Sequence, residues 1–579
     1  MIIRLLLGLF LTFGVSQSNA AKKPNIIVVM PDDMGYGDLG VTGNPVIRTP
    51  QIDQFASESA QLTHFYVSPV CSPTRACLMT GRYNYRTRVV DTFKGRSMMD
   101  PAEVTIAEAL KAAGYTTGIF GKWHLGDNHP LRAQEQGFDE VLIHRGGGLA
   151  QPSEPIENGR RYTNPILFHN GKKIQSEGYC TDVYFDAAMD FIGAASDEGR
   201  PFFAYVAPNA PHGPYHDVPQ ALLEYYQSID LNPILGKNMS DKHRDTVARV
   251  FAMVENIDEN MGRLDSFLKK RQLIENTIVV FFTDNGPNTM RYVGPFRGMK
   301  AGVHEGGIRT CFFARWPGHF RAGHHSDRIA AHIDLMPTLL DAAGVVPQNG
   351  DNFDGISVLP LLMGSPENWP DRSLFIQTHR GDRPIAEHHV AIRSQFWKLV
   401  HPSGFGQNQM PENVPFELYH IMTDPGEEYN LAGKNPHRVS SMRQDYARWL
   451  TAVSATRRPN FVPPRIDIGV HPEPVVDLSI QDWRVPADST GWGISGEWFV
   501  TVQDSGPYGV AIRFSEPVGS RQLEVLVGEL HVPMSLSEEQ SVASAENIEL
   551  PLGDTTVRVH SDPPLKRGDL PRFVTFKKR

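Results

Sequence analysis

Cys71-Ser72-Pro73-Thr74-Arg75 begins the stretch on which the rest of the chain depends, and it continues as Ala-Cys-Leu-Met-Thr-Gly-Arg82. Most lone cysteines in proteins behave as small buried hydrophobes, and Cys71 taken alone would be one of them. The short pattern Cys-x-Pro-x-Arg also occurs by chance now and then. Its extension to Leu-x-Thr-Gly-Arg is much harder to reach by chance, so Cys71 and Arg75 are candidate functional residues.

Two predicted strands end in acidic or amide side chains. Residues 25–30 and 276–283 are continuous apolar runs rich in β-branched residues, as in the buried strands of a parallel sheet. The oxygen donors that follow these runs are Asp32, Asp33, Asp284 and Asn285. Open α/β sheets place ligand sites at the carboxyl ends of their strands, although a solvated acidic turn is the alternative for either pair alone. Oxygen donors without His or Cys favour Ca²⁺ or Mg²⁺ over zinc.

Basic residues follow predicted strands in the same way. Lys122 and His124 come after the strand predicted at 116–120 and lie between glycines, so both can point into one site. His212 follows the strand predicted at 201–206, and Lys300 closes an Arg-Gly-Met-Lys string after the strand at 276–283. A single His in such a position is often structural, and an exposed Lys is usually solvated. The whole set, rather than any member, indicates a site for an anion.

Together these segments resemble the formylglycine-dependent (type I) sulfatases, the arylsulfatase family of the alkaline phosphatase superfamily. The resemblance rests on the Cys71 stretch, the Asp32-Asp33 loop, Gly121-Lys-Trp-His124 and the Arg-Gly-x-Lys and Glu-Gly-Gly-Ile-Arg309 strings, which occur in family order. It covers roughly residues 23–455. It implies that Cys71 is oxidised to an aldehyde, 3-oxoalanine (formylglycine), at the start of a helix, where Pro73 suits the first turn and the helix N-terminus favours anions.

The resemblance also implies roles for the candidate residues. Ca²⁺ is favoured over Mg²⁺, with Asp32, Asp33, Asp284, Asn285 and the hydrated aldehyde at Cys71 around it. One hydroxyl of the hydrated aldehyde attacks sulfur, and loss of the other proton expels inorganic sulfate. Arg75 orients the hydrate, and Asp284 is the carboxylate suggested as proton acceptor. The groups that clamp sulfate are Lys122, His124 and Lys300, and His212 is the general acid, although the sequence leaves open which histidine takes that role.

The segment 127–180 is loop-rich and supplies candidate substrate contacts. His144-Arg145 precedes Gly146-Gly147-Gly148, and Gly-rich loops can cradle an anion with backbone N–H groups. A flexible connection explains the triplet about as well. We expect His144, Arg145 and the later His216 to contact substrate. Glu305 and Arg309, by contrast, read as a structural pair that ties a loop down.

The 579 residues are too many for one compact domain. We expect a signal peptide at 1–20, a catalytic domain at 22–365, and a small subdomain with an antiparallel sheet and one helix at 366–456. A Pro-rich linker at 457–474 then leads to a β-rich module at 475–579 that reads as a small β-sandwich. The predicted fold class is α/β, with a large mixed, mostly parallel central sheet flanked by helices. Trp483, Trp492 and Trp498 of the last module suit either a sugar site or its core.

The composition limits the partners. A net charge of −9 and the lack of a basic tract exclude nucleic acid, so an anionic substrate needs a local cationic cluster. The N-terminal segment, with Arg4 before a short apolar run, predicts export to the periplasm or the medium, and no other stretch suits a membrane span. Four cysteines, one of them committed to the aldehyde, allow at most one disulfide.

The sequence therefore predicts an exported sulfatase that releases inorganic sulfate from sulfate esters, on sulfated carbohydrates or aryl esters. It implies a formylglycine-generating enzyme as a partner. Two alternatives remain open at this stage. One is a phosphonate or phosphate monoester hydrolase of the same superfamily, and the other is a sugar-binding protein with a relic site.

Overall fold

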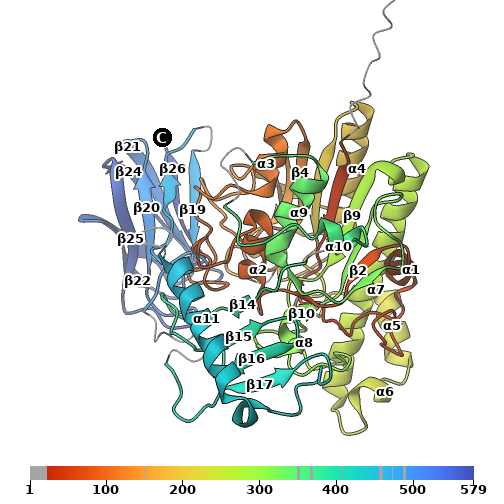
Figure 1. Ribbon diagram of the computed structural model, residues 1–579. Coiled ribbons are helices and arrows are strands. Elements are labelled where there is room, and N and C mark those ends of the chain that lie inside the picture. The colour runs from red at the N-terminus through yellow and green to blue at the C-terminus, as the bar shows by residue number, and fades with distance from the viewer. Residues whose placement is uncertain are drawn as a thin grey trace, which may run out of the picture.

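The computed structural model describes residues 23–149, 151–347, 352–365, 369–406, 409–455, 461–471, 474–486, 489 and 491–579. The predicted signal peptide lies outside these residues. Within them, no helix has the combination of length and apolar character that crossing a membrane requires. Three assemblies follow one another along the chain, and Figure 1 shows the last of them, in blue, at the left of the molecule.

A ten-stranded mixed sheet forms the first assembly, in the order β12-β2-β11-β9-β1-β8-β4-β5-β6-β7. Its strands are β1 (Asn25–Val29), β2 (Ala60–Leu62), β4 (Thr116–Lys122), β5 (Glu140–His144), β6 (Ile166–His169), β7 (Lys172–Gln175), β8 (Phe202–Ala207), β9 (Thr277–Phe282), β11 (Phe312–Arg315) and β12 (His325–Ser326). The five central strands, β9 to β5, run parallel. The apolar runs predicted as buried strands thus form the middle of the sheet. Three other segments of the ten-stranded sheet, β5, β6 and β7, lie within residues 127–180, which the sequence predicted to be loop-rich.

Helices cover both faces of this sheet (Figure 1). Side chains of β1 alternate between two cores: Ile27 and Val29 pack in one, and Ile26 and Val28 in the other. The first core is closed by α1 (Pro50–Ser57), α4 (Cys180–Asp197), α5 (Gln220–Ser228) and α7 (Asp241–Lys270), and the second by α2 (Cys71–Thr80), α3 (Ile106–Ala112), α9 (Leu335–Ala342) and α10 (Leu359–Leu362). This double-sided burial explains why the central strands are apolar at every position.

Smaller elements complete this assembly. A three-stranded sheet joins β10 (Arg309–Thr310), β3 (Phe65–Tyr66) and β13 (Ala330–Ala331). The short helices are α6 (Asn232–Leu235) and α8 (Glu305–Ile308). The four cysteines, Cys71, Cys77, Cys180 and Cys311, are all free and buried.

The second assembly is an antiparallel sheet, β14 (Leu374–Gln377), β15 (Val390–Arg393), β16 (Trp397–His401) and β17 (Glu417–His420), with helix α11 (Pro436–Ser454) against it. Buried ion pairs attach it to the first assembly. Lys398 Nζ lies 2.9 Å from a carboxylate oxygen of Glu305 and 2.9 Å from one of Glu427. Burial alone would raise the pKa of Glu305, but Lys398 and Arg309 lower it to about 2. Glu305 and Arg309 are therefore structural, as predicted.

The third assembly is a β-sandwich. One sheet holds β18 (Ile466–Ile468), β20 (Glu497–Val502), β25 (Gly553–Asp562), β22 (Arg521–Val527) and β23 (Leu530–Leu536), and the other holds β19 (Val475–Ser479), β26 (Phe573–Lys578), β21 (Gly506–Arg513) and β24 (Val542–Leu550). Strand β18 pairs with β20 although it lies in the stretch read as a linker. The Pro-rich stretch thus belongs in part to the sandwich, because its Ile-Asp-Ile run supplies an edge strand.

Two of the three tryptophans in this module belong to its core. Trp483 and Trp498 are 2% and 1% exposed, and the Trp498 indole donates a hydrogen bond to the carbonyl of Ser479 at 2.6 Å. A ring enclosed to this degree cannot stack on a sugar, so the core interpretation is correct for both.

Replacing Trp498 by alanine should cost about 3–5 kcal/mol of stability, because it leaves a large cavity between the two sheets. Urea unfolding followed by circular dichroism measures the change. Phe396→Ala is the control: its ring is 50% exposed, so the loss there should stay within about 0.5 kcal/mol. Equal losses in the two variants would contradict this view of the core.

Candidate active site

Cys71 is the first residue of α2 and is 3% exposed. Val70 before it is extended, Pro73 lies in the first turn where an N–H would have no intrahelical acceptor, and Gly81 ends the helix in a left-handed conformation (φ 66°). Every residue of α2 is buried. The helix therefore enters the protein interior with its positive N-terminal end, and Cys71, at the centre of the site.

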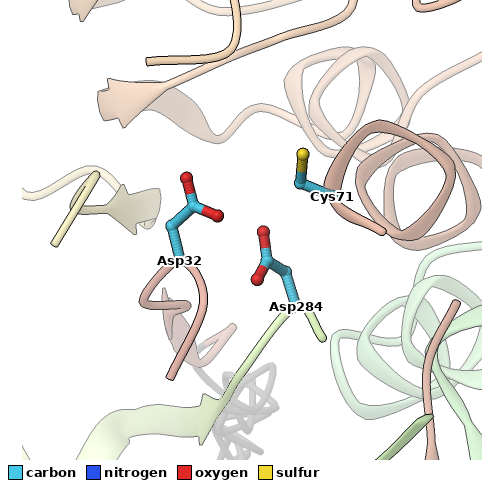
Figure 2. A group of neighbouring side chains, drawn as sticks. All are labelled: Asp32, Cys71 and Asp284. Carbon is cyan, nitrogen blue, oxygen red and sulfur yellow. The ribbon is translucent and has the colours of Figure 1, made fainter. Parts of the chain in front are cut away.

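The acidic residues meet Cys71 at the carboxyl edge of the central sheet. Strands β1 and β9 are parallel neighbours, so Asp32 and Asp284, which follow them, lie side by side. The backbone N–H of Asp33 donates to Asp284 Oδ1 at 3.1 Å. Single ligand atoms of Asp32, Cys71 and Asp284 lie within 4.8 Å of one another, and Figure 2 shows the three side chains converging from a loop, a helix and a strand end.

This oxygen cluster fits a hard divalent cation. Three buried oxygens accept no hydrogen bond from any described residue, namely Asp32 Oδ1, Asp33 Oδ2 and Asn285 Oδ1. Buried acceptors are normally satisfied, and these three belong to residues that follow the parallel strands β1 and β9 at the sheet edge. The donors are carboxylate and amide oxygens, which suit Ca²⁺ or Mg²⁺ rather than zinc. Asp32, Asp33, Asp284 and Asn285, with residue 71, would hold the ion.

Three cations each bind one oxygen of a different carboxylate. Lys122 Nζ lies 2.5 Å from Asp32 Oδ2, and Lys300 Nζ binds Asp33 Oδ1. Arg75 donates to Asp284 Oδ2 at 2.9 Å, to the Lys122 carbonyl at 2.9 Å and to the Tyr205 hydroxyl at 3.2 Å. When all three carboxylates are ionised, their charges and those of the three cations cancel. A divalent ion would therefore leave a surplus of two positive charges for an anionic substrate.

Burial sets the protonation of these groups. It raises the pKa of the Cys71 thiol, and Lys122 and Lys300 offset this only in part. An unmodified Cys71 would thus be a thiol rather than a reactive thiolate. Burial and the neighbouring Asp32 raise the pKa of Asp284 to about 7. For Asp32 itself, burial is outweighed only by Lys122, His212, Arg75 and Lys300 together, and its pKa lies well below the usual range.

Two histidines border the cluster. His124 Nε2 donates to the Thr92 carbonyl at 2.7 Å, so Nδ1 faces Cys71 Sγ at 3.4 Å. His212 Nδ1 donates to the Gly213 carbonyl at 2.7 Å, and its Nε2 lies 3.8 Å from Asp33 Oδ2. Burial lowers the pKa of both rings, for His124 with the help of Lys122. Each ring therefore points one nitrogen into the site while a carbonyl fixes the other.

The glycine triplet lies against these histidines. A Cβ on Gly147 would come within 2.5 Å of the His124 ring, and one on Gly148 within 3.2 Å of His212. Asp127 accepts the N–H of Gly146 and holds the loop in place. The sequence indicated this loop only weakly, and the packing explains why two of its positions need glycine.

The three residues predicted to contact substrate, His144, Arg145 and His216, make contacts outside the Cys71 cluster. His144 is fully buried, and its Nδ1 is 3.0 Å from the Arg145 carbonyl and 3.7 Å from Glu154. The Arg145 guanidinium lies over the Phe168 ring at 4.2 Å. His216 is exposed, and its carbonyl accepts from Arg249. These contacts give the three side chains no link to Cys71, and their role in substrate binding stays a prediction.

Some residues that shape the site gave no signal in the sequence. Tyr205 binds Arg75 from inside β8, and the Thr74 hydroxyl donates to the Asp284 carbonyl at 2.7 Å. Thr92 acts only through its carbonyl, which any residue could supply. Only the alternation of inward and outward positions along β8 could have indicated Tyr205.

The sequence matches two models of known protein families. The model of the sulfatase family matches residues 24–345, and that of the C-terminal region of N-sulphoglucosamine sulphohydrolase matches residues 299–452. The chain belongs to the sulfatase family. Sulfatases are sulfuric ester hydrolases, so the predicted class of enzyme is confirmed, as is the predicted α/β fold.

Individual proteins that are similar to this sulfatase support the same family assignment. It is 31% identical to N-acetylgalactosamine-6-sulfatase of Canis lupus familiaris, over 82% of this chain and 92% of the relative. It is 31% identical to human arylsulfatase A, over 73% and 87%. The solved structure of Ps i-CgsB with k-i-k-neocarrahexaose superimposes with a TM-score of 0.63 at 27% identity, covering 76% of this chain and 95% of that one.

Calcium should stabilise this sulfatase through the oxygen cluster. At a free Ca²⁺ concentration 100 times the dissociation constant, the expected gain in unfolding free energy is about 2.7 kcal/mol. Denaturation in Ca²⁺ or in EDTA measures it for the wild type, for Asp32→Ala and for the control Asp371→Ala at an exposed carboxylate.

The gain should persist in Asp371→Ala and fall strongly in Asp32→Ala. Because each protein is compared with itself, the intrinsic cost of either substitution cancels. An equal gain in Asp32→Ala, or no gain in the wild type, would contradict the metal assignment.

Proposed function

We propose that this sulfatase hydrolyses sulfate esters of carbohydrates to the free alcohol and inorganic sulfate, with residue 71 converted to formylglycine and Ca²⁺ bound beside it. The observation that carries the proposal is the placement of Cys71 at a buried helix N-terminus, with a ligand atom within 4.8 Å of those of Asp32 and Asp284. Burial raises the pKa of Cys71, so an ordinary thiol at this position would stay protonated.

The roles follow from the contacts. Arg75 and Asp284 form a fully buried pair that fixes the carboxylate next to residue 71. Lys122, Lys300 and the helix N-terminus surround the point where a sulfate group would lie, and such fixed charges stabilise charge that builds up on the transferred group. The aldehyde hydrate would supply an oxygen nucleophile, which the cation would make more acidic.

His212 is the best-placed general acid. Its Nδ1 is fixed by the Gly213 carbonyl, its side chain is 15% exposed, and Nε2 lies 3.8 Å from Asp33 Oδ2. His124 is more enclosed, at 3% exposure, and its free nitrogen faces Cys71. We therefore assign proton donation to the leaving oxygen to His212, and positioning of residue 71 and sulfate to His124.

The carbohydrate part of the proposal has separate support. The N-acetylgalactosamine-6-sulfatases are named for a sulfated sugar, and Ps i-CgsB was solved with a neocarrahexaose. We also propose export to the periplasm or the medium, and a formylglycine-generating enzyme as maturation partner, on the strength of the N-terminal segment and of Cys71-x-Pro-x-Arg75.

Parallel kinetics on sulfate, phosphate and phosphonate monoesters with the same aryl group test the reaction class. We expect kcat/KM to be highest for the sulfate, and Cys71→Ala to lack turnover. A preference for the phosphonate would favour the monoester hydrolases, of which that of Agrobacterium radiobacter shares the fold at a TM-score of 0.52. Sugar binding without turnover of any ester by modified protein would favour the relic-site alternative.

Loss of the general acid should depend on the leaving group. His212→Gln should lower kcat about 10²- to 10⁴-fold on a sugar sulfate, whose alkoxide needs a proton, and much less on nitrophenyl sulfate. His437→Gln, at an exposed histidine in α11, is the matched control and should leave both rates unchanged. Equal losses of His212→Gln on both substrates would contradict the assignment.

A further inference from the structure

We propose that Arg380 forms a second anion subsite beside the active site, which binds a sulfate or carboxylate group of the substrate other than the one that is hydrolysed. This inference rests on the proposed function and specifies its substrate as a glycan with at least two anionic groups. It follows from the position of Arg380, from how its guanidinium is held, and from the charge around it.

Contacts connect Arg380 to one wall of the site. Its Nη1 lies 2.8 Å from both carboxylate oxygens of Asp91. The next residue, Thr92, accepts the hydrogen bond from His124, whose other nitrogen faces Cys71. The residue after that, Phe93, lies under the guanidinium at 4.5 Å from the ring centroid. Three consecutive residues thus link Arg380 to the nucleophile position.

A second chain of contacts connects Arg380 to the segment that carries Lys300. The guanidinium lies 4.5 Å from the centroid of Phe405, whose ring is 6.1 Å from that of His389. His389 Nε2 donates to the carbonyl of Ala301 at 2.7 Å, and Ala301 follows the sulfate-clamping Lys300. Arg380 is therefore linked by contacts both to the segment that holds His124 and to the segment that carries Lys300.

The guanidinium is pre-organised. It contacts two aromatic rings, those of Phe93 and Phe405, and the Phe93 ring is fixed in turn by the Trp492 ring at 5.0 Å in an edge-to-face arrangement. Arginine binds sulfate and carboxylate through parallel N–H donors, and stacking removes the entropy that a mobile side chain would lose. The sequence left open whether Trp492 belongs to a sugar site or to the core. Its contact with Phe93 supports the subsite indirectly.

Arg380 is also open to a ligand. Its side chain is 31% exposed, whereas those of Lys300 and His212 are 12% and 15% exposed. Nη1 binds Asp91, and the N–H groups on Nε and Nη2 have no protein acceptor in the described part of the chain. The residue thus lies further out than the sulfate clamp, with donors left over.

The surroundings carry a surplus of positive charge. Lys94, Arg96, Arg380 and Arg484 gather here, and among the described residues Asp91 and Asp382 are the acidic groups that pair with them. Burial together with Arg96 and Arg380 lowers the pKa of Lys94, and burial with Arg96 lowers that of Arg484 to about 10. A chain with a net charge of −9 thus has the local cationic cluster that a polyanionic substrate needs.

Kinetics with three substrates test the subsite. Nitrophenyl sulfate carries no second anion. Of two sulfated oligosaccharides, one carries a second sulfate and the other carries a carboxylate. Arg380→Gln should raise KM on the oligosaccharide that uses the subsite by about 10- to 100-fold, the size expected for losing charge-assisted hydrogen bonds. kcat/KM on nitrophenyl sulfate should change less than about threefold, and Arg380→Lys should restore part of the affinity. The oligosaccharide that responds identifies the anion.

Arg438→Gln provides the matched control, since this exposed arginine also lies over an aromatic ring, that of Trp397, in the second assembly. Equal losses on nitrophenyl sulfate and on the oligosaccharides would overturn the proposal, because they would show that Arg380 only positions Asp91 and Thr92. Unchanged KM on both oligosaccharides would also overturn it.

Titration calorimetry on Cys71→Ala protein gives a readout without turnover. The oligosaccharide with two anionic groups should bind about tenfold or more weakly when Arg380→Gln is added to this background. Failure of the wild type to hydrolyse any sulfate ester would refute the proposed function, whereas an intact wild-type rate with no effect of Arg380→Gln would refute only the subsite.

Discussion

Repulsion between carboxylates at one edge of the sheet is the constraint on which the rest of the structure depends. Parallel pairing of β1 and β9 places Asp32 and Asp284 together in a fully buried position. Burial of like charges without partners is prohibitive, so cations must converge there. Arg75 comes from α2, Lys122 from the end of β4 and Lys300 from the loop after β9, and each of these elements is oriented to deliver its charge.

The same constraint explains why this fold suits sulfate transfer. The internal cations only cancel the carboxylates, so a bound divalent ion decides the sign of the site. With it, the site attracts an anion through fixed charges that need no rearrangement during the reaction. Without it, the buried oxygens of Asp32, Asp33 and Asn285 that accept no hydrogen bond lower the stability of the fold.

The C-terminal sandwich is a wall of the active site rather than a separate appendage. Gln481 donates to the Thr92 carbonyl at 2.9 Å, the same oxygen that fixes His124. Its own carbonyl accepts the N–H of Gly95. Burial and Asp127 raise the pKa of the neighbouring Asp482 well above its usual range, and Asp127 is the residue that holds the glycine loop. The sandwich therefore helps to hold the carbonyl that fixes His124.

The sequence was informative where chemistry and secondary structure coincide. The strands of the sheet centre and the residues after them carry their own signal, because double-sided burial demands apolar runs and the site demands charged ends. Tyr205, Thr92 and Gln481 could not be predicted, since each acts through packing or a backbone atom brought close by distant pairing. The strand β18 was read as linker because three residues beside prolines carry no periodicity. The pairing of Arg380 with Asp91 joins positions 289 residues apart, and no local pattern encodes it.

We propose that residue 71 acts as an aldehyde and not as a thiol. Mass spectrometry of the tryptic peptide 49–75 from protein purified from its native host tests this most directly. The account predicts a peptide that has lost one sulfur and two hydrogens and gained one oxygen. An unmodified cysteine in fully active protein would contradict it.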